Sequence, residues 1–358
     1  MATLKYRNWQ FVGLMLLGLG LASACTAPQA PQTEASATPA PQAGGTPAVV
    51  ETGAPQVADS EISPRVTLAT WNLENFFDAV DDPYNDEIVS AREYAEKLGG
   101  LSSVLQEVNA DIVSVSEVEK GESLAELGRR SGYPYSLVVP GNDRYRGIQV
   151  GILSKIPLGP HVSHAKDKLQ TEAGKETAFS RDCLEVHFKH PSQLTVLANH
   201  FKSKRGGAKS DAQRWAQAKR VREIAQGLAN YPLAICGDLN EEPQNKPLQP
   251  LLSAPFLTDV LGHMPLEQRR TFFNERYQSA LDYIIINDKL KPFLVTGSAK
   301  IYSNIPNIER ISDHRPVKVE FDFSALPAFA APSAVESAQE DAAAAAGAAP
   351  GIPANPAP

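Results

Sequence analysis

The sequence predicts a mixed α/β fold in which two packed sheets are flanked by helices. Apolar runs with strand-like alternation outnumber helical segments, and the two kinds do not alternate strictly as they would in a doubly wound sheet. The hydrophobic content of 42% and the charged content of 21% are typical of a globular protein. A body of about 260 residues remains once both ends are set aside, and it is long enough to bury a large core.

Strands are predicted where short apolar or alternating runs are bounded by turn-forming residues. In chain order they cover residues 66–71, 111–118, 135–139, 148–153, 179–189, 194–201, 233–237, 281–287, 294–302 and 316–323. Helices are predicted where apolar residues recur three and four positions apart, at residues 89–109, 122–131 and 210–228. Ser210 can cap the last helix, which places Trp215, Val221, Ile224 and Leu228 on one face.

The N-terminus has the pattern of a signal peptide over residues 1–24. Lys5 and Arg7 precede an apolar stretch, residues 11–21, that is too short to span a bilayer comfortably. The segment Ala22-Ser23-Ala24-Cys25 satisfies the small-residue rule for cleavage and also resembles a bacterial lipobox. We therefore expect an exported chain whose Cys25 is lipidated and whose only membrane contact is that anchor, with simple secretion as the alternative.

The segments on either side of the body predict no fold of their own. Residues 25–63 and 326–358 are rich in Ala and Pro without periodicity, which predicts a flexible tether and tail around one domain at residues 64–325. Thr26 is not the Asp typical of inner-membrane retention, which favours an outer-membrane lipoprotein. These ends carry most of the formal net charge of −7, so the body is close to neutral. Such a body does not coat nucleic acid, but it can hold a local basic groove.

Polar residues recur at the tips of otherwise apolar strands. They are Asn72, Glu74, Glu117, His200, Asp238, Asn240, Asp282, Asp313 and His314. Any one of them has a simple explanation as a cap, a turn residue or a satisfied core histidine, but six such tips are hard to explain separately. Packed together, they would form a carboxylate-rich pocket that repels itself unless a divalent cation is bound. The oxygen-rich donor set favours Mg²⁺ or Mn²⁺ over zinc.

Cysteine and histidine spacing elsewhere predicts no further site. Cys183 and Cys236 each lie in an apolar run without Cys-x-x-Cys spacing, so we predict buried thiols rather than a disulfide. The pairs His161/His164 and His187/His190 are three apart, which on a strand places the two members of each pair on opposite faces and argues against a metal site.

Six short motifs contain the polar tips. They are Thr70-Trp71-Asn72-Leu73-Glu74-Asn75, Ser116-Glu117-Val118, Asn199-His200-Phe201, Gly237-Asp238-Leu239-Asn240, Leu281-Asp282-Tyr283 and Ser312-Asp313-His314. Their order and content resemble the endonuclease/exonuclease/phosphatase superfamily, in its bacterial secreted branch, and they span the whole body. The resemblance implies a DNase I-like, four-layered α/β sandwich of two mainly antiparallel sheets, with the active site at one edge.

The resemblance also implies roles for the residues of these motifs. Glu117 would be the principal Mg²⁺ (or Mn²⁺) ligand, with Asn72, Glu74 and Asp313 nearby. Asp282 would accept a hydrogen bond from His314, and the general base would be either this pair or Asp238. Asn240 would donate to a phosphate oxygen, and His200 would stabilise the developing charge.

Basic residues outside the motifs bear on the substrate. Arg146 and Arg181 resemble phosphate-facing arginines of the superfamily, with surface ion pairs as the alternative. Arg315 touches phosphate or forms an ion pair at the rim. The stretch from Lys202 to Arg222 carries many Lys and Arg residues against Asp211 alone, which predicts either a rim that tracks the phosphates of nucleic acid or a solvated helix face.

We therefore expect a monomeric, exported, divalent-metal-dependent phosphoesterase, and within that class a nuclease that acts on nucleic acid. The first alternative is a phosphatase or phosphodiesterase that acts on a small-molecule or lipid phosphoester. The second is a non-catalytic surface-binding module on the same fold.

Overall fold

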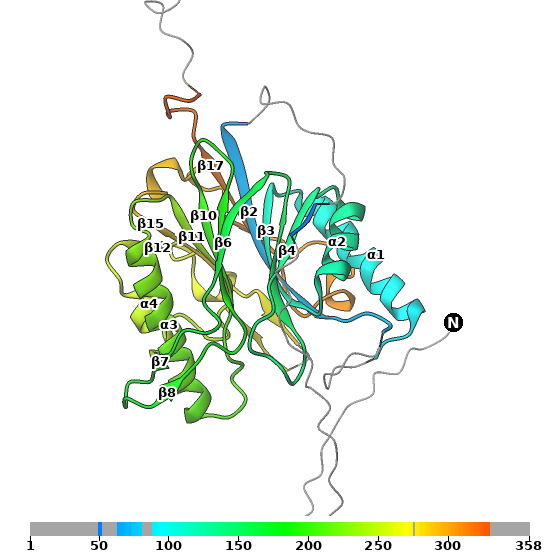
Figure 1. The fold of residues 1–358 in the computed structure, drawn as a ribbon, viewed down its shortest axis with the longest axis horizontal. Coiled ribbons are helices and arrows are strands. Elements are labelled where there is room, and N and C mark those ends of the chain that lie inside the picture. Colours follow the sequence, from blue (N-terminus) through cyan, green and yellow to red (C-terminus); the bar gives the residue numbers. More distant parts are fainter. Residues whose placement is uncertain (1–48, 52–62, 81–87, 275, 330–358) are drawn as a thin grey trace, which may run out of the picture. The chain divides into compact units, whose positions relative to one another are not determined.

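The computed structural model describes residues 49–51, 63–80, 88–274 and 276–329, all within one compact unit, Gly45–Pro358 (Figure 1). The predicted signal peptide, Cys25, and most of the predicted tether and tail lie outside these residues. Within them, no helix has the length and apolar character needed to cross a membrane.

Among the described residues, seven strands form the first sheet in the order β1-β4-β5-β3-β2-β17-β16. In chain order they are β1 (Val49–Glu51), β2 (Arg65–Phe76), β3 (Ile112–Val118), β4 (Tyr135–Val138), β5 (Gln149–Ser154), β16 (Lys300–Ile301) and β17 (Val317–Asp322). Strands β2 and β3 are parallel, and the other neighbours are antiparallel.

The second sheet has six described strands in the order β12-β15-β11-β10-β9-β6. They are β6 (Leu158–Ser163), β9 (Cys183–Phe188), β10 (Thr195–His200), β11 (Leu233–Asp238), β12 (Leu257–Asp259) and β15 (Asp282–Asn287). Only β10 and β11 are parallel neighbours here. Two small hairpins complete the described strands: β7 (Leu169–Gln170) with β8 (Glu176–Thr177), and β13 (Phe272–Phe273) with β14 (Gln278–Ser279).

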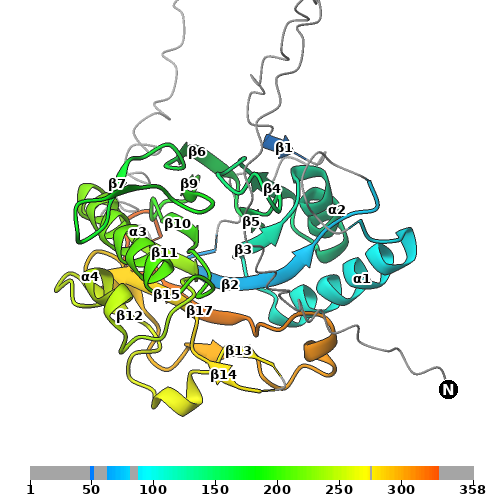
Figure 2. The same cartoon turned by 90° about the horizontal axis from the view of Figure 1, so that it is seen from below.

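Helices cover the outer face of each sheet, which makes four layers as the sequence predicts (Figures 1 and 2). Helices α1 (Ala91–Val108) and α2 (Gly121–Ser131) pack on the first sheet, and α3 (Ala208–Gly227) and α4 (Gln249–Leu252) pack on the second. Short 3₁₀ turns lie at Lys246–Leu248, Leu266–Gln268, Lys291–Phe293 and Ile308–Arg310. The predicted start of α1 is correct because Ser90 and Glu93 form a capping box.

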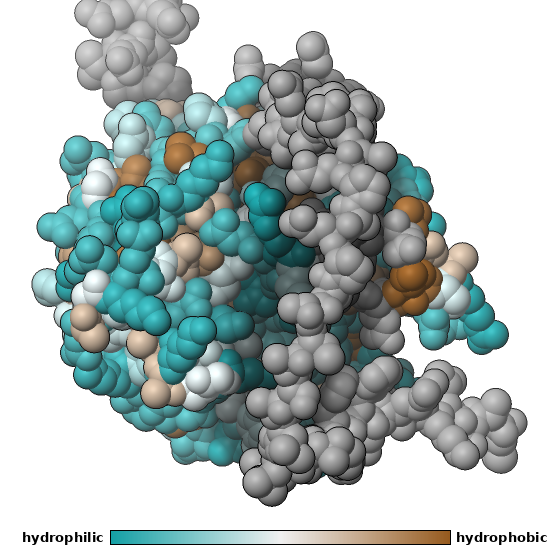
Figure 3. All heavy atoms as spheres, turned by 60° about the horizontal axis from the view of Figure 1, so that its bottom comes forward, coloured by the Kyte–Doolittle hydropathy of each residue, from teal (hydrophilic) through white to brown (hydrophobic). Residues whose placement is uncertain are grey.

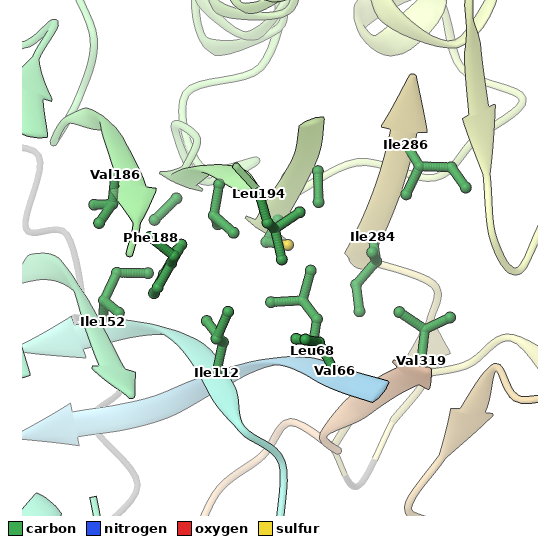
Figure 4. Packing of buried hydrophobic residues seen from close by; sticks show 14 of the residues in the cluster. Val66, Leu68, Ile112, Ile152, Val186, Phe188, Leu194, Ile284, Ile286 and Val319 are labelled. Atoms are coloured by element: carbon green, nitrogen blue, oxygen red, sulfur yellow. The ribbon is translucent and has the colours of Figure 1, made fainter. Parts of the chain in front are cut away.

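The main core lies between the two sheets. Figure 4 shows apolar side chains from both sheets meeting there, with Leu68, Ile112 and Val319 on one side and Val186 and Ile284 on the other. Period-two alternation explains this arrangement, because β17 places Val317, Val319 and Phe321 inward and its charged residues outward. Cys183 and Cys236 are buried free thiols, as predicted.

Several predicted boundaries are wrong. Ser210 does not cap α3, because the cap position is Gly207 and the Ser210 hydroxyl donates to the Arg205 carbonyl instead. The strand predicted at residues 294–302 is reduced to Lys300–Ile301, since Gly297 adopts a left-handed turn with a φ of 77°. Strand β6 was not predicted because Gly159 and Pro160 interrupt its apolar pattern.

The domain is also longer than predicted at both ends. Strand β1 falls inside the predicted tether and pairs antiparallel with β4. Leu326 and Phe329, inside the predicted tail, pack against the core between the sheets.

Candidate active site

The predicted site residues gather at one edge of the two sheets because of strand direction. The parallel pairs β2/β3 and β10/β11 place their C-terminal ends at this edge, and the antiparallel strands β15 and β17 begin there. His200, Asp238 and Asp282 are directly paired across β10, β11 and β15, so their side chains share one face. Figure 3 brings this end of the molecule forward and shows mainly hydrophilic residues on it.

His314 forms a tight pair with Asp282. Its Nδ1 lies 2.7 Å from Asp282 Oδ2, and both side chains are buried. The backbone around it is held by the Trp71 indole, which donates to the His314 carbonyl at 2.9 Å, and by the Ser312 hydroxyl, which donates to the Asn72 carbonyl at 2.7 Å. The remaining imidazole nitrogen, Nε2, is thereby aimed at the site.

Asp238 faces that nitrogen. The His314 Nε2 lies 3.8 Å from Asp238 Oδ2. Burial raises the pKa of Asp238 to about 7, against the opposing effect of His314. Burial alone would lower the pKa of His314, but the carboxylates of Asp282 and Asp238 outweigh it and raise that pKa well above its ordinary value. The charge of each group therefore shifts the pKa of the other.

Glu117 is presented by a strained turn. It has a φ of 62°, and the pairing of β3 with both neighbours shifts register around it, as in a β-bulge. The Asn75 backbone N–H donates to Glu117 Oε2 at 3.0 Å, and the Asn72 amide lies 3.5 Å from Oε1. Glu74 and Asn75 also have positive φ, so the end of β2 is strained in the same way.

Glu74 and Asp313 are two neighbouring carboxylates beside Glu117. The Asp313 N–H donates to Glu74 Oε2 at 3.0 Å. Burial, together with the Asp313 charge, raises the pKa of Glu74 to about 7, and burial raises the pKa of Asp313 as well. Lys97, which the sequence did not single out, donates to the Ile311 carbonyl at 2.5 Å and interacts electrostatically with all three carboxylates.

The carboxylates around Glu117 suit a divalent cation that has few protein ligands and keeps several waters. The crowding of Glu117, Glu74 and Asp313 favours a cation near them. Within the described part of the chain, no three His, Cys, Asp or Glu side chains converge closely enough to hold a metal ion by themselves. Mg²⁺ typically takes one or two protein carboxylates and keeps several waters, so an open set of Glu117, Asn72 and a neighbouring carboxylate suits it better than zinc.

His200 and Asn240 lie on the other side of Asp238. His200 is buried, and its Nε2 lies 3.6 Å from Asp238 Oδ2 and 3.8 Å from Glu117 Oε1. Burial, and next the Arg181 charge, lowers the pKa of His200 well below its ordinary value, so the ring is neutral. The Asn240 amide donates to Asp238 Oδ2 at 3.1 Å and to the Phe201 carbonyl at 3.2 Å, so it positions Asp238 in this structure.

Of the residues predicted to bind phosphate, Arg181 and Arg146 lie close to the carboxylates of the site. Arg181 is buried rather than on the surface, paired with Asp143 at 3.1 Å and electrostatically linked to Glu117 and Asp238. Arg146 Nη2 lies 3.4 Å from Glu117 Oε2 and also contacts the Asn75 side chain.

Lys202 and Arg315 lie further out. Lys202 follows Phe201, and its backbone N–H donates to Gln217. The Arg315 guanidinium lies over the Phe273 ring and donates to the Arg270 carbonyl, which turns it toward a neighbouring hairpin.

Two multi-strand sheets flanked by helices form a DNase I-like α/β fold. The chain belongs to the endonuclease/exonuclease/phosphatase family, whose sequence profile matches residues 67–318. Members of this family hydrolyse phosphoesters and generally use divalent metals. No curated protein matches the sequence.

Solved structures share the fold at low sequence identity. TDP2 from Caenorhabditis elegans is 16% identical, with 72% of this chain and 74% of that chain covered and a TM-score of 0.50. Humanized TDP2 of D. rerio is 15% identical, with 72% and 99% covered and a TM-score of 0.52. The human Nocturnin catalytic domain is 19% identical, with 73% and 95% covered and a TM-score of 0.49. At these identities the likeness to the two TDP2 structures concerns the fold alone.

Proposed function

We propose that the chain is a divalent-metal-dependent phosphodiesterase, and specifically a nuclease. The observation that carries the proposal is the His314–Asp282 pair, which faces Asp238 on one side of the site and the carboxylate group around Glu117 on the other. Hydrolysis of a phosphodiester needs a proton acceptor for water and stabilisation of negative charge on the phosphoryl oxygens. The side with His314, Asp282 and Asp238 would accept the proton, and a divalent cation held on the Glu117 side would stabilise the negative charge.

The chain's own residues would act as follows. Asp282 holds the Nδ1 proton of His314, and the proton of an attacking water passes either to Asp238 or, when His314 is neutral, to its Nε2. Neutral His200 donates a hydrogen bond to a phosphoryl oxygen, and buried Arg181 adds positive potential behind it. Glu117 and Asn72 would hold Mg²⁺ or Mn²⁺, which supplies charge neutralisation at the phosphoryl group when bound.

Positive charge beside the site supports a nucleic-acid substrate. The loop after His200 is anchored to α3, where the Arg214 side chain donates to the Lys202 carbonyl at 2.9 Å. Arg205 on this loop and Lys209 in the first turn of α3 are exposed. An anchored basic loop that follows directly from a site residue suits a polyanion that continues past the scissile phosphate.

Parallel assays of the purified chain test this proposal. Plasmid DNA, RNA, bis-p-nitrophenyl phosphate and sphingomyelin are offered with Mg²⁺, Mn²⁺ or EDTA. We expect cleavage of DNA or RNA that EDTA abolishes. Cleavage of the generic diester alone, or of the lipid alone, would contradict the nuclease assignment, and no turnover of any substrate would favour a binding module.

Export and lipidation of Cys25 form a separate part of the proposal, which the N-terminal sequence supports. In a bacterial host, labelled fatty acid should be incorporated into the full chain and not into Cys25→Ala. Release of unlabelled wild-type chain into the medium would instead support simple secretion.

A further inference from the structure

The β13–β14 hairpin is hydrogen-bonded directly to the catalytic segment. Phe272 and His314 form an antiparallel bridge, the Phe273 N–H donates to the Asp313 carbonyl at 3.0 Å, and the Arg315 N–H donates to the Thr271 carbonyl at 2.7 Å. The Thr271 hydroxyl also accepts from the Asp282 N–H at 3.0 Å. These bonds fix the register of the hairpin against both members of the His314–Asp282 pair. Figure 2 shows β13 and β14 beside β17.

Aromatic rings lead outward from His314 along this hairpin. The Phe272 ring meets the His314 imidazole edge-on, with centroids 5.0 Å apart, and the Tyr277 ring lies 5.7 Å from Phe272. Tyr277 is 56% exposed, although its backbone is ordered by Asn274, whose side-chain oxygen accepts from the Tyr277 N–H at 2.9 Å. We call Phe272 and Tyr277 the aromatic shelf.

A cation lies on the other face of the hairpin. Consecutive strand residues point to opposite faces, so Phe273 lies on the other side of β13 from Phe272, and the Arg315 guanidinium carbon lies 4.6 Å from the Phe273 ring centroid. Tyr277 is instead an exposed ring in contact with Phe272, which itself contacts the His314 imidazole. Exposed aromatic rings are surfaces on which the bases of single-stranded nucleic acid stack.

We infer that the aromatic shelf is a stacking subsite for an unpaired nucleobase next to the scissile phosphate, with Tyr277 as its exposed face. This inference rests on the proposed nuclease function and narrows it to single-stranded substrate. Bases inside a duplex already stack on one another, so only an unpaired or terminal base offers a free face to Tyr277.

Binding without turnover tests the shelf. In EDTA, the purified chain is titrated with a fluorescent eight-nucleotide thymidine oligomer and with an abasic oligomer that has the same number of phosphates. Tyr277→Ala should weaken binding of the thymidine oligomer by about fivefold or more, on the scale of one lost base stack. Binding of the abasic oligomer should stay within about twofold, and Tyr277→Phe should keep both affinities.

Tyr231→Ala is the matched control. Tyr231 is 37% exposed and precedes β11, at the end of the strand opposite Asp238. An equal loss for both oligomers, or no loss in Tyr277→Ala, would overturn the inference. If base-dependent binding through Tyr277 is found but no substrate is cleaved with Mg²⁺ or Mn²⁺, the subsite stands and the proposed nuclease function fails.

Kinetics on two small diesters provide a second readout. The p-nitrophenyl ester of thymidine 5′-phosphate and ethyl p-nitrophenyl phosphate share a leaving group, and only the first carries a sugar and a base. Tyr277→Ala should raise KM for the nucleotide ester alone, with kcat little changed. An equal rise for both esters would mean that the shelf binds the leaving group and not the base.

Discussion

His314 is fixed through its ring, its carbonyl and its backbone N–H, which Asp282, Trp71 and Ser312 contact respectively. Because the ring cannot turn without breaking the Asp282 contact, Nε2 keeps one direction. His314→Ala should therefore lower kcat by at least about 10²-fold on any diester that the protein cleaves. His161→Ala, on the edge strand β6, is the control and should keep full activity. Near-normal turnover by His314→Ala would contradict the assigned role.

Lys97 acts as a fixed cation beside the carboxylates. Lys97→Met should lower the free energy of unfolding in EDTA by about 1–3 kcal/mol, because the Ile311 carbonyl loses its donor and the carboxylates lose a counter-charge. Mg²⁺ should recover part of that loss, so its stabilising effect should be larger in Lys97→Met than in Lys97→Arg. Urea denaturation with EDTA or Mg²⁺ measures both, and an identical Mg²⁺ effect in the two variants would refute this reading.

Asp182 links stability to pH outside the site. Burial raises its pKa to about 6, so the folded state binds this proton more tightly than the unfolded chain does. Ionisation then destabilises the fold as pH rises toward 6, and the penalty persists above it. The free energy of unfolding of Asp182→Asn, relative to that of wild type, should rise by on the order of 1 kcal/mol from pH 5 to pH 8. Urea denaturation at several pH values measures this difference. The exposed Asp288→Asn is the control, and a pH-independent difference for Asp182→Asn would contradict the expectation.

At the residue scale, the sequence predicted which residues form the site better than it predicted the contacts between them. Polar residues at strand tips are visible in the sequence, and the structure brings Glu117, His200, Asp238 and His314 together. Lys97 gave no such signal, because a lysine in an amphipathic helix looks like any solvated lysine until the Ile311 carbonyl is placed beside it.

The parallel pair β10/β11 depends on one close backbone approach. A Cβ on Gly237, whose φ is 138°, would lie 1.9 Å from the Asn199 carbonyl oxygen. Gly237→Ala should cost on the order of 3 kcal/mol, from the backbone conformation and the clash together. Gly99→Ala, in α1 with no atom near the added methyl, should instead stabilise by about 0.5–1 kcal/mol. Thermal denaturation compares the two, and equal melting temperatures would contradict the clash.

At the element scale, long periodic segments were predictable and interruptions were not. Helix α1 and strand β3 follow directly from periodicity, while the Ser90–Glu93 capping box at the start of α1 was not predicted. The bulge at Glu117 depends on the pairing of β3 with strands on both sides, which no local pattern encodes. The Phe272–Tyr277 contact is likewise invisible, because two-residue strands carry almost no periodic signal.

The whole molecule is held by the core between its sheets, and that core reaches beyond the predicted domain end. A chain ending at Ala325 should be less stable than one ending at residue 330 by about 1–3 kcal/mol, because it lacks the apolar contacts of Leu326 and Phe329. Guanidinium denaturation of both chains measures the difference, and Leu326→Ala/Phe329→Ala in the full chain should reproduce it. Equal stability of the two chains would support the predicted domain end at residue 325.

At this scale the order and type of elements predicted a sandwich with helices outside it, since helices and sheets with one apolar face have few ways to cover one another. The four layers were implied by the family resemblance. The strand order within each sheet did not, because long-range pairing such as that of β2 with β17 leaves no local trace.

Left-handed backbone at Glu74, Asn75, Glu117 and Asn240 has a consequence for engineering. Each such residue costs about 1–2 kcal/mol that glycine would avoid. A screen for heat-resistant variants that ignores turnover would therefore drift toward glycine at this edge and discard its carboxylates and amides. Thermal robustness and catalysis select opposite residues at the same four positions, so only a screen that scores both can improve one without losing the other.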